Sequence, residues 1–152
     1  MPICECSASV SRHMCPWLTH DPLDVTALLA EVASEGCGAT TLFLGTVRRT
    51  ENDGDVVGIE YSSYDAMAEA ELDGVLADAR ARGPGVRIAM RHRLGYVATG
   101  EVSVAIAVAA PHRSAALDAC RFVIDQTKER VPVWKKERLA EGTERWVGPH
   151  GG

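Results

Sequence analysis

The longest apolar run of the chain, VSVAIAVAA from Val102 to Ala110, constrains the fold more than any other segment. A nearly uninterrupted run of this kind predicts a central strand of a sheet, which we place over 101–109. The run is strand-sized, far shorter than the ~20 residues with which a helix crosses a bilayer. We therefore expect a protein that does not span a membrane.

The periodicity of the apolar residues elsewhere predicts a mixture of helices and strands. Helical spacing favours helices over 23–35, 65–82 and 111–130, and strand patterns occupy 39–47, 56–63 and 86–93, with short extended segments at 133–134 and 145–147. We interpret 39–47 and 56–63 as neighbouring strands joined by the polar loop 48–55, and 95–100 as a turn. This order predicts an α+β fold in which helices pack on a mixed, largely antiparallel sheet.

The length of 152 residues and the hydrophobic share of 46% fit one domain. We expect this domain over 18–152, after a disordered leader over 1–17. The leader contains Cys4, Cys6, His13 and Cys15, which leave a zinc site open as an alternative, although their spacing matches no common zinc finger. It lacks the basic and apolar segments of a secretory signal, so we expect a cytoplasmic protein without a disulfide framework.

The formal net charge of −5 at pH 7 argues against a protein that binds nucleic acid. The cations are nevertheless concentrated in the second half of the chain. Between positions 91 and 138 they are Arg91, His92, Arg93, His112, Arg113, Arg121, Lys128, Arg130, Lys135, Lys136 and Arg138. This asymmetry predicts a local site for an anion in an acidic protein.

His112 and Arg113 stand where the apolar strand meets the predicted start of a helix. The first-turn amides of a helix lack partners and the helix dipole adds positive charge, so this junction suits a phosphate group. The alternative is an ordinary exposed first turn. Arg48 ends another predicted strand beside the polar loop, and it is either a substrate clamp or an exposed charge.

Lysine is used selectively in this chain. The three lysines, Lys128, Lys135 and Lys136, fall within nine residues, whereas thirteen arginines supply the other cations. A lysine amine can lose its proton when it is desolvated or crowded by cations, so it can act as base, acid or nucleophile. Lys128 shares a helix face with Ile124 and could reach from that face into a pocket. The alternative is a solvated basic patch.

Cys37 and Cys120 are candidates for a nucleophile that carries sulfur, because persulfide chemistry needs a thiolate. Cys120 lies among apolar residues of a predicted helix, and Cys37 lies between two glycines. Structural roles are therefore favoured for both. A cysteine-based sulfurtransferase remains an alternative, in which a cysteine-to-serine change abolishes activity.

The sequence resembles the large subunits of molybdopterin synthase in three blocks that occur in the order and spacing of that family. The blocks are FLGTVR at 43–48, APHR at 110–113 and KERVPVWKKE at 128–137. Shorter matches are Tyr61-x-x-Tyr64-x-x-Met67-Ala68-Glu69, HRLG at 92–95, Gly100-Glu101 and the segment 141–147. The resemblance covers roughly 18–147, and the PVWKKE block is its most specific part.

This resemblance implies an α/β hammerhead-type fold and a homodimer of large subunits. It also implies a small ubiquitin-like sulfur-carrier subunit at each end of a heterotetramer, with the carrier's C-terminal Gly-Gly thiocarboxylate entering a pocket of the large subunit. By matching position, Lys128 and Lys135 are implied as the catalytic amines. The implied substrate and pocket contacts are Thr46, Val47, Arg48, His112, Arg113, Lys136 and Glu137, with Phe43 and Ile124 lining the site. Family members often have methionine in place of Ile124.

The family's reaction converts cyclic pyranopterin monophosphate into molybdopterin by inserting two dithiolene sulfurs. The clustered cations and lysines suit this reaction, because a phosphate and a thiocarboxylate both need cations and sulfur transfer needs proton movement. The carrier supplies activated sulfur, so we expect no metal and no cofactor in this subunit. The alternative is a non-catalytic phosphate-ligand sensor domain, which would need Arg48, His112 and Arg113 but no titratable lysine.

Overall fold

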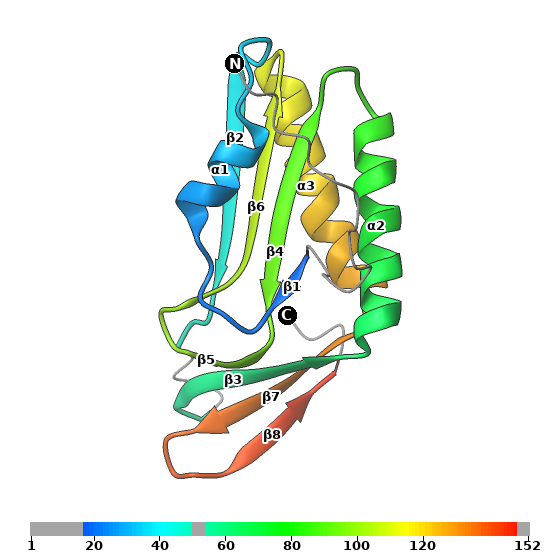
Figure 1. Ribbon diagram of the computed structural model, residues 1–152. Helices are drawn as coiled ribbons and strands as arrows, with labels where there is room; N and C mark the ends of the chain where they lie inside the picture. Colours follow the sequence, from blue (N-terminus) through cyan, green and yellow to red (C-terminus); the bar gives the residue numbers. More distant parts are fainter. Residues whose placement is uncertain (1–16, 50–53, 149–152) are drawn as a thin grey trace, which may run out of the picture.

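The computed structural model describes residues 17–49 and 54–148 (Figure 1). The helices are α1 (Val25–Val32), α2 (Asp65–Ala81) and α3 (Arg113–Arg130). The strands are β1 (Leu18–Thr19), β2 (Ala39–Thr46), β3 (Val56–Ser63), β4 (Arg87–Arg93), β5 (Gly95–Ala98), β6 (Val102–Ala110), β7 (Val133–Leu139) and β8 (Glu144–Val147). The expected leader and its possible zinc ligands lie outside the described residues, except Trp17, whose indole Nε1 donates to Asp73 of α2 at 2.7 Å.

The first of two four-stranded sheets has the order β1-β4-β6-β2. Its strand β6 pairs antiparallel with β2 on one side and with β4 on the other, and every residue from Ser103 to Ala110 is buried. The prediction of a central strand is therefore confirmed. Strand β1 adds to the sheet in parallel with β4.

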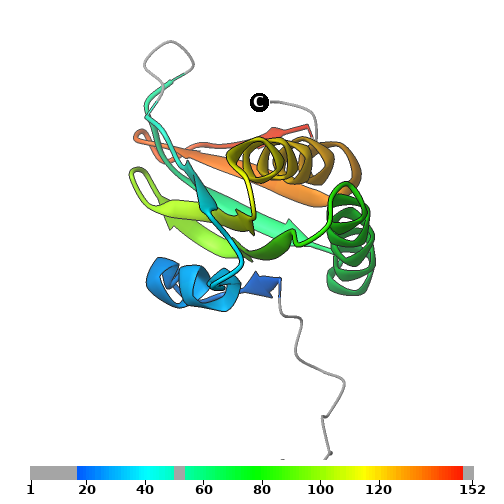
Figure 2. The ribbon, with the colours of Figure 1, turned by 90° about the horizontal axis from the view of Figure 1, so that it is seen from above.

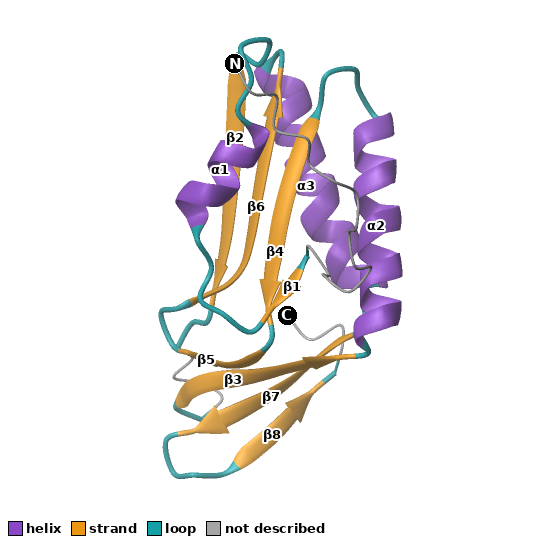
Figure 3. Cartoon of the chain, viewed as in Figure 1, coloured by secondary structure: helices purple, strands orange, loops and turns teal. Residues whose placement is uncertain are grey.

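The second sheet has the order β5-β3-β7-β8, and all of its neighbours are antiparallel. Figures 1 and 3 show it lying across one end of the first sheet. The α+β class with mostly antiparallel strands is confirmed, but the strands divide into two sheets.

Three details of the strand prediction were wrong. Strands β2 and β3 are not neighbours, because β2 pairs with the apolar β6 and β3 pairs with β5 and β7. The predicted turn at 95–100 contains β5, and the short segment at 133–134 is the start of β7, which continues to Leu139. The rest of β7 was missed because it lacks the alternation of apolar and polar residues that predicts a strand. Its charged side chains are instead paired with residues of neighbouring strands, such as Arg138 with Glu60.

The helices cover opposite faces of the first sheet, as the view in Figure 2 shows. On one face, Leu28 and Val32 of α1 pack against alanines of β4 and β6. On the other face, larger side chains of α2 and α3 meet Met90 and Ile106. Successive side chains of a strand point to opposite faces of the sheet. The small residues of β4 and β6 therefore face α1, and the large residues between them face α2 and α3.

The end of α3 is fixed in position relative to α2 and β7. The guanidinium of Arg130 contacts Glu71 at 3.2 Å and Asp78 at 2.8 Å, both on α2. Pro132 then prevents the helix from continuing, and β7 begins at Val133. This turn brings the last turn of α3 and the first residues of β7 to the junction of the two sheets.

The burial pattern predicts different costs for two leucine-to-alanine changes. Leu76→Ala removes a side chain of α2 that is 0% exposed, and we expect it to lower the free energy of unfolding by about 2–5 kcal/mol. Leu117→Ala on α3 removes a side chain that is 57% exposed, and its expected cost is about 0.5 kcal/mol or less. Urea denaturation of both variants measures the difference, and equal costs would contradict the assigned core.

Candidate active site

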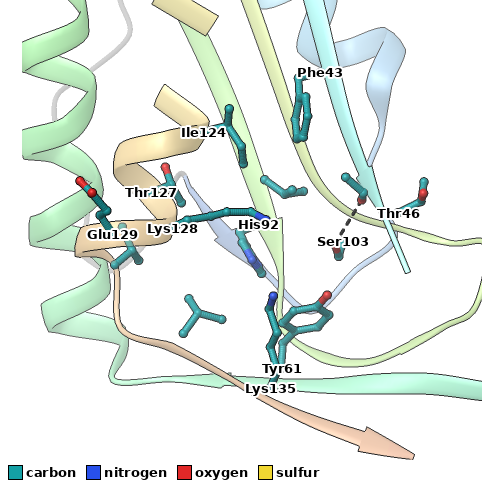
Figure 4. Close-up of a pocket in the computed structure, with 14 residues that line it drawn as sticks. Phe43, Thr46, Tyr61, His92, Ser103, Ile124, Thr127, Lys128, Glu129 and Lys135 are labelled. Carbon is teal, nitrogen blue, oxygen red and sulfur yellow. Dashed lines mark hydrogen bonds between the residues drawn. The ribbon is translucent and has the colours of Figure 1, made fainter. Parts of the chain in front are cut away.

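A cavity of about 360 Å³ lies where the end of α3 and both sheets meet (Figure 4). We call it the lysine cavity. Its lining residues are Phe43, Gly45, Thr46, Tyr61, His92, Ser103, Val104, Ile124, Thr127, Lys128, Glu129, Val131, Val133 and Lys135. Five of the predicted site residues are among them: Phe43, Thr46, Ile124, Lys128 and Lys135.

Lys128 and Lys135 reach the lysine cavity from different elements, α3 and β7. Burial lowers the pKa of the Lys135 amine, and the positive charge of Lys128 lowers it further, while the carboxylate of Glu137 opposes the shift. The ammonium of Lys128, an exposed residue, thus makes the half-buried amine of Lys135 easier to deprotonate. This is the property that acid-base or nucleophilic chemistry requires of a lysine.

Phe43 and Ile124 form an apolar wall of the lysine cavity (Figure 4). Gly45 of β2 belongs to this region, and a Cβ atom there would lie 2.6 Å from Cγ1 of Val104. Only glycine allows β2 and the Val104 side chain of β6 to approach this closely. The wall can exclude water from a bound planar ligand, while the lysines supply charge.

Five polar residues of the lysine cavity were not predicted as site residues: Tyr61, His92, Ser103, Thr127 and Glu129. Burial lowers the pKa of His92 to about 4, with a further contribution from the charge of Lys135, although the hydrogen bond to Arg93 opposes the shift. Burial also raises the pKa of Tyr61, against a hydrogen bond with Ser103. Tyr61 and His92 do lie in the matched family blocks, and this was the feature of the sequence that could have identified them as site residues.

Three predicted residues, two just beyond the end of β2 and one in the middle of β7, do not line the lysine cavity. Val47 is 2% exposed and packs with Tyr61 and other core residues, so its side chain is structural. Arg48 is exposed just beyond the end of β2. Lys136 alternates with Lys135 on β7 and lies on the other face of the second sheet, where it contacts Glu144 at 3.1 Å.

Glu137 of β7 also stays outside the lining. Its carboxylate accepts a hydrogen bond from Nε of Arg145 on β8 at 3.0 Å. Its effect on the lysine cavity is indirect: its negative charge raises the pKa of Lys135.

His112 and Arg113 lie at the opposite end of α3 from Lys128. The helix rises 1.5 Å per residue, so the 15 residues from Arg113 to Lys128 span roughly 22 Å. Both side chains are exposed, and His112 is the N-cap residue. Within one chain, these two cations therefore cannot join the lysines in one cavity.

Neither described cysteine lines the lysine cavity. Cys120 is 4% exposed and burial raises the pKa of its thiol, which disfavours the thiolate. The Cys37 thiol donates to the carbonyl oxygen of Gly85 at 3.8 Å. Both positions fit the structural roles that the sequence favoured. Within 17–49 and 54–148, no helix has the length and apolar character of a membrane span, and no acidic, histidine or cysteine side chains form a metal-binding group.

Comparisons with known proteins identify the family. The family model described as "MoaE protein" matches residues 18–130. Molybdopterin synthase catalytic subunit 2 of Aedes aegypti is 47% identical over 126 residues, which cover 82% of this chain and 81% of that protein. The molybdopterin synthase catalytic subunit of Culex quinquefasciatus is also 47% identical over 126 residues, with 82% and 80% covered.

Solved structures agree with this assignment. Molybdopterin synthase from Staphylococcus aureus matches with a TM-score of 0.83 and 31% identity, over 90% of this chain and 99% of that chain. The MoaE protein of Burkholderia ambifaria matches with a TM-score of 0.69 and 36% identity, over 86% of each chain. A complex of subunits 1 and 2 of molybdopterin-converting factor from Helicobacter pylori has a TM-score of 0.73 at 24% identity, over 88% of this chain and 90% of that chain, a likeness of fold.

The chain belongs to the MoaE protein family, and its relatives are enzyme subunits. Its function is that of a catalytic subunit of molybdopterin synthase, in the biosynthesis of the molybdenum cofactor. The sensor domain considered from the sequence alone is therefore set aside.

The buried His92 predicts a pH dependence of stability. The unfolded chain takes up a proton on this imidazole below pH 6.5, but the folded chain does so only near pH 4, so acid favours unfolding across this interval. The difference corresponds to at most about 3 kcal/mol. We expect the stability of His92→Gln to fall less than that of the wild type between pH 7 and pH 4.5 in urea denaturation. Parallel pH profiles of the two proteins would refute a neutral buried imidazole.

Proposed function

We propose that this subunit inserts two dithiolene sulfurs into cyclic pyranopterin monophosphate to form molybdopterin. The sulfur arrives as a thiocarboxylate on the C-terminal Gly-Gly of a small ubiquitin-like sulfur-carrier subunit. The observation that supports this reaction is the convergence of Lys128 and Lys135 on one cavity with an apolar wall. The transfer uses the two substrates and water.

The chemistry assigns proton movement to the amines. The thiocarboxylate sulfur forms a bond to an electrophilic carbon of the pterin side chain while a carbon–oxygen bond at that carbon breaks, and the oxygen leaves as phosphate or as water. Water then hydrolyses the resulting thioester between that sulfur and the carrier's carbonyl carbon. The carrier leaves as a carboxylate, and the sulfur remains on the product. An ammonium at Lys128 would stabilise the developing negative charge, while the more easily deprotonated Lys135 would accept or donate the protons.

A carrier tail suits the lysine cavity for two reasons. Glycines have no side chains, so an extended Gly-Gly segment can enter a narrow opening that other residues would block. Its terminal thiocarboxylate is an anion, which the two lysines attract. A two-subunit arrangement is also found in the H. pylori complex of similar fold.

We further propose that a second copy of this chain completes the site through strand β2. This strand is an edge of the first sheet, and its eight residues, ATTLFLGT, include neither a charge nor a proline. Its side chains Leu42 and Leu44 are 37% and 40% exposed. An uncharged edge strand can pair with another strand, and a twofold axis would pair β2 antiparallel with its own copy.

This pairing would bring the separated cations to the lysines. His112 and Arg113 follow the end of β6 that pairs with Ala39, and the amide of Gly38 donates to the carbonyl oxygen of Pro111 at 3.3 Å. They therefore lie at the start of β2, whereas Thr46 lies at its end. In an antiparallel pair, the start of one strand is next to the end of the other, so His112 and Arg113 of a second copy would approach the lysine cavity and could bind the substrate phosphate.

The roles of the amines predict a loss of activity that charge alone cannot restore. In reconstituted enzyme with thiocarboxylated carrier and the cyclic pterin, Lys128→Ala and Lys135→Ala should lower the rate of dithiolene formation by about 10²–10⁴-fold. Lys135→Arg should fail similarly, because arginine keeps its proton. Cys37→Ser is the control and should remain active. Undiminished product from both alanine variants would remove the lysines from the mechanism, and an inactive Cys37→Ser would favour a cysteine nucleophile.

The shared site predicts complementation between two inactive variants. When Lys135→Ala and Arg113→Ala proteins exchange subunits in a 1:1 mixture, each mixed dimer regains one cavity with both residues intact, and about a quarter of wild-type activity should return. Lys135→Ala mixed with Lys128→Ala is the matched control. It should not recover, because both lysines line the same cavity of one chain. A failure of Arg113→Ala to complement would show that Arg113 does not act across the dimer.

A further inference from the structure

The imidazole of His92 lines the lysine cavity but has no part in the reaction proposed above. Its residue is 8% exposed, and its Nδ1 lies 2.9 Å from the carbonyl oxygen of Arg93. A carbonyl oxygen can only accept a hydrogen bond, so Nδ1 carries the hydrogen of the neutral ring. The other nitrogen, Nε2, is then an unprotonated acceptor on the ring edge that points away from this carbonyl.

The position of the ring is fixed by its surroundings. The backbone amide of His92 donates to the carbonyl oxygen of Trp17 at 2.7 Å, and β4 is paired on both sides, by β1 and β6. The ring meets Tyr61 edge-on, with centroids 5.2 Å apart and planes at 75°. Nε2 is therefore held in one place. A residue can orient another group only if its own position is fixed in this way.

The ionisable groups around His92 come from three elements. Lys135 lies on β7, Lys128 and Glu129 on α3, and the Tyr61 phenol on β3, while β6 contributes only Ser103 and Val104 to the lining. In the view of Figure 4 the imidazole is drawn between the ends of Lys128 and Lys135. Burial and the charge of Lys135 keep the pKa of His92 at about 4, so at neutral pH the ring adds no third positive charge.

From this geometry we infer that His92 is a positioning residue, whose Nε2 accepts a hydrogen bond from the amine of Lys135 and directs that amine towards the reacting atoms. The inference rests on the proposed function of Lys135 as a catalytic amine. A neutral acceptor suits this task, because an amine and an ammonium can both donate to it. A carboxylate in its place would hold the lysine as an ammonium and hinder proton transfer.

The tautomer of His92 can be tested in the wild-type protein without any substrate. In ¹⁵N NMR spectra of protein labelled in histidine, assigned by comparison with His92→Gln, Nδ1 should be protonated and Nε2 unprotonated from pH 8 to pH 5. A His92 that titrates near its ordinary pKa of 6.5, or that carries its hydrogen on Nε2, would overturn the inference.

The effect on Lys135 can be followed through the Cε signals of ¹³C-labelled lysine, because the chain has only three lysines. His92→Leu removes the acceptor, and the pKa of Lys135 should fall by about one pH unit, because its ammonium loses a hydrogen bond. His92→Gln, whose side-chain oxygen is an acceptor, should restore most of that value. Met90→Val is the control, because Met90 is buried in β4 but does not line the lysine cavity, and it should leave the pKa of Lys135 unchanged.

Activity supplies a second readout. His92→Leu should lower kcat by about 10–100-fold with KM little changed, and His92→Gln should retain most of the rate. An unaltered pKa of Lys135 in His92→Leu, or equal losses of kcat in the Leu and Gln variants, would overturn the positioning role. An active Lys135→Ala enzyme would instead refute the proposed function, and the NMR result for His92 would stand.

Discussion

The short connection between α3 and β7 is the constraint on which the site depends. Only Val131 and Pro132 separate the last residue of the helix from the first residue of the strand. Proline cannot continue the helix, and the amide of Val133 bonds back to the carbonyl oxygen of Val131 at 2.9 Å, so the chain turns at once. Lys128 and Lys135 therefore meet in one cavity, although one lies on a helix and the other on a strand.

The antiparallel pairing of β3 with β7 makes this arrangement specific. Tyr61 lies directly opposite Lys135 in the register, so both side chains point to the same face of the second sheet. A shift of one residue would turn Lys136 inward and place its amine where that of Lys135 now lies. The polar pairs on the outer face, including Lys136 with Glu144 and Arg138 with Glu60, disfavour that shift because each would lose its partner.

Sequence reasoning predicted the elements whose patterns are local. The apolar β6 and the helix α3 were recognisable because one is a continuous apolar run and the other has helical spacing up to a proline. The division into two sheets could not be predicted, because it depends on which distant strands pair. His92 was named among the cations and in a matched family block, but not as a site residue. Nothing in its neighbouring residues shows that Tyr61 and Lys135, 31 and 43 residues away, would line the same cavity. The separation of His112 from Lys128, by contrast, could have been predicted, because the sequence places both on one helix and a helix rises 1.5 Å per residue.

The electrostatics of the lysine cavity connect binding to proton movement. The charge of Lys128 and partial burial both disfavour the ammonium of Lys135 in the free protein. A bound thiocarboxylate or phosphate would reverse this balance, because an anion beside the amine favours its charged form. Binding of the anionic substrate is then linked to uptake of a proton at Lys135, and release of the product to loss of that proton. Because His92 is neutral, proton uptake on binding would occur at Lys135. An imidazolium at the same position would already neutralise part of the ligand's negative charge, and the pKa of Lys135 would then rise less.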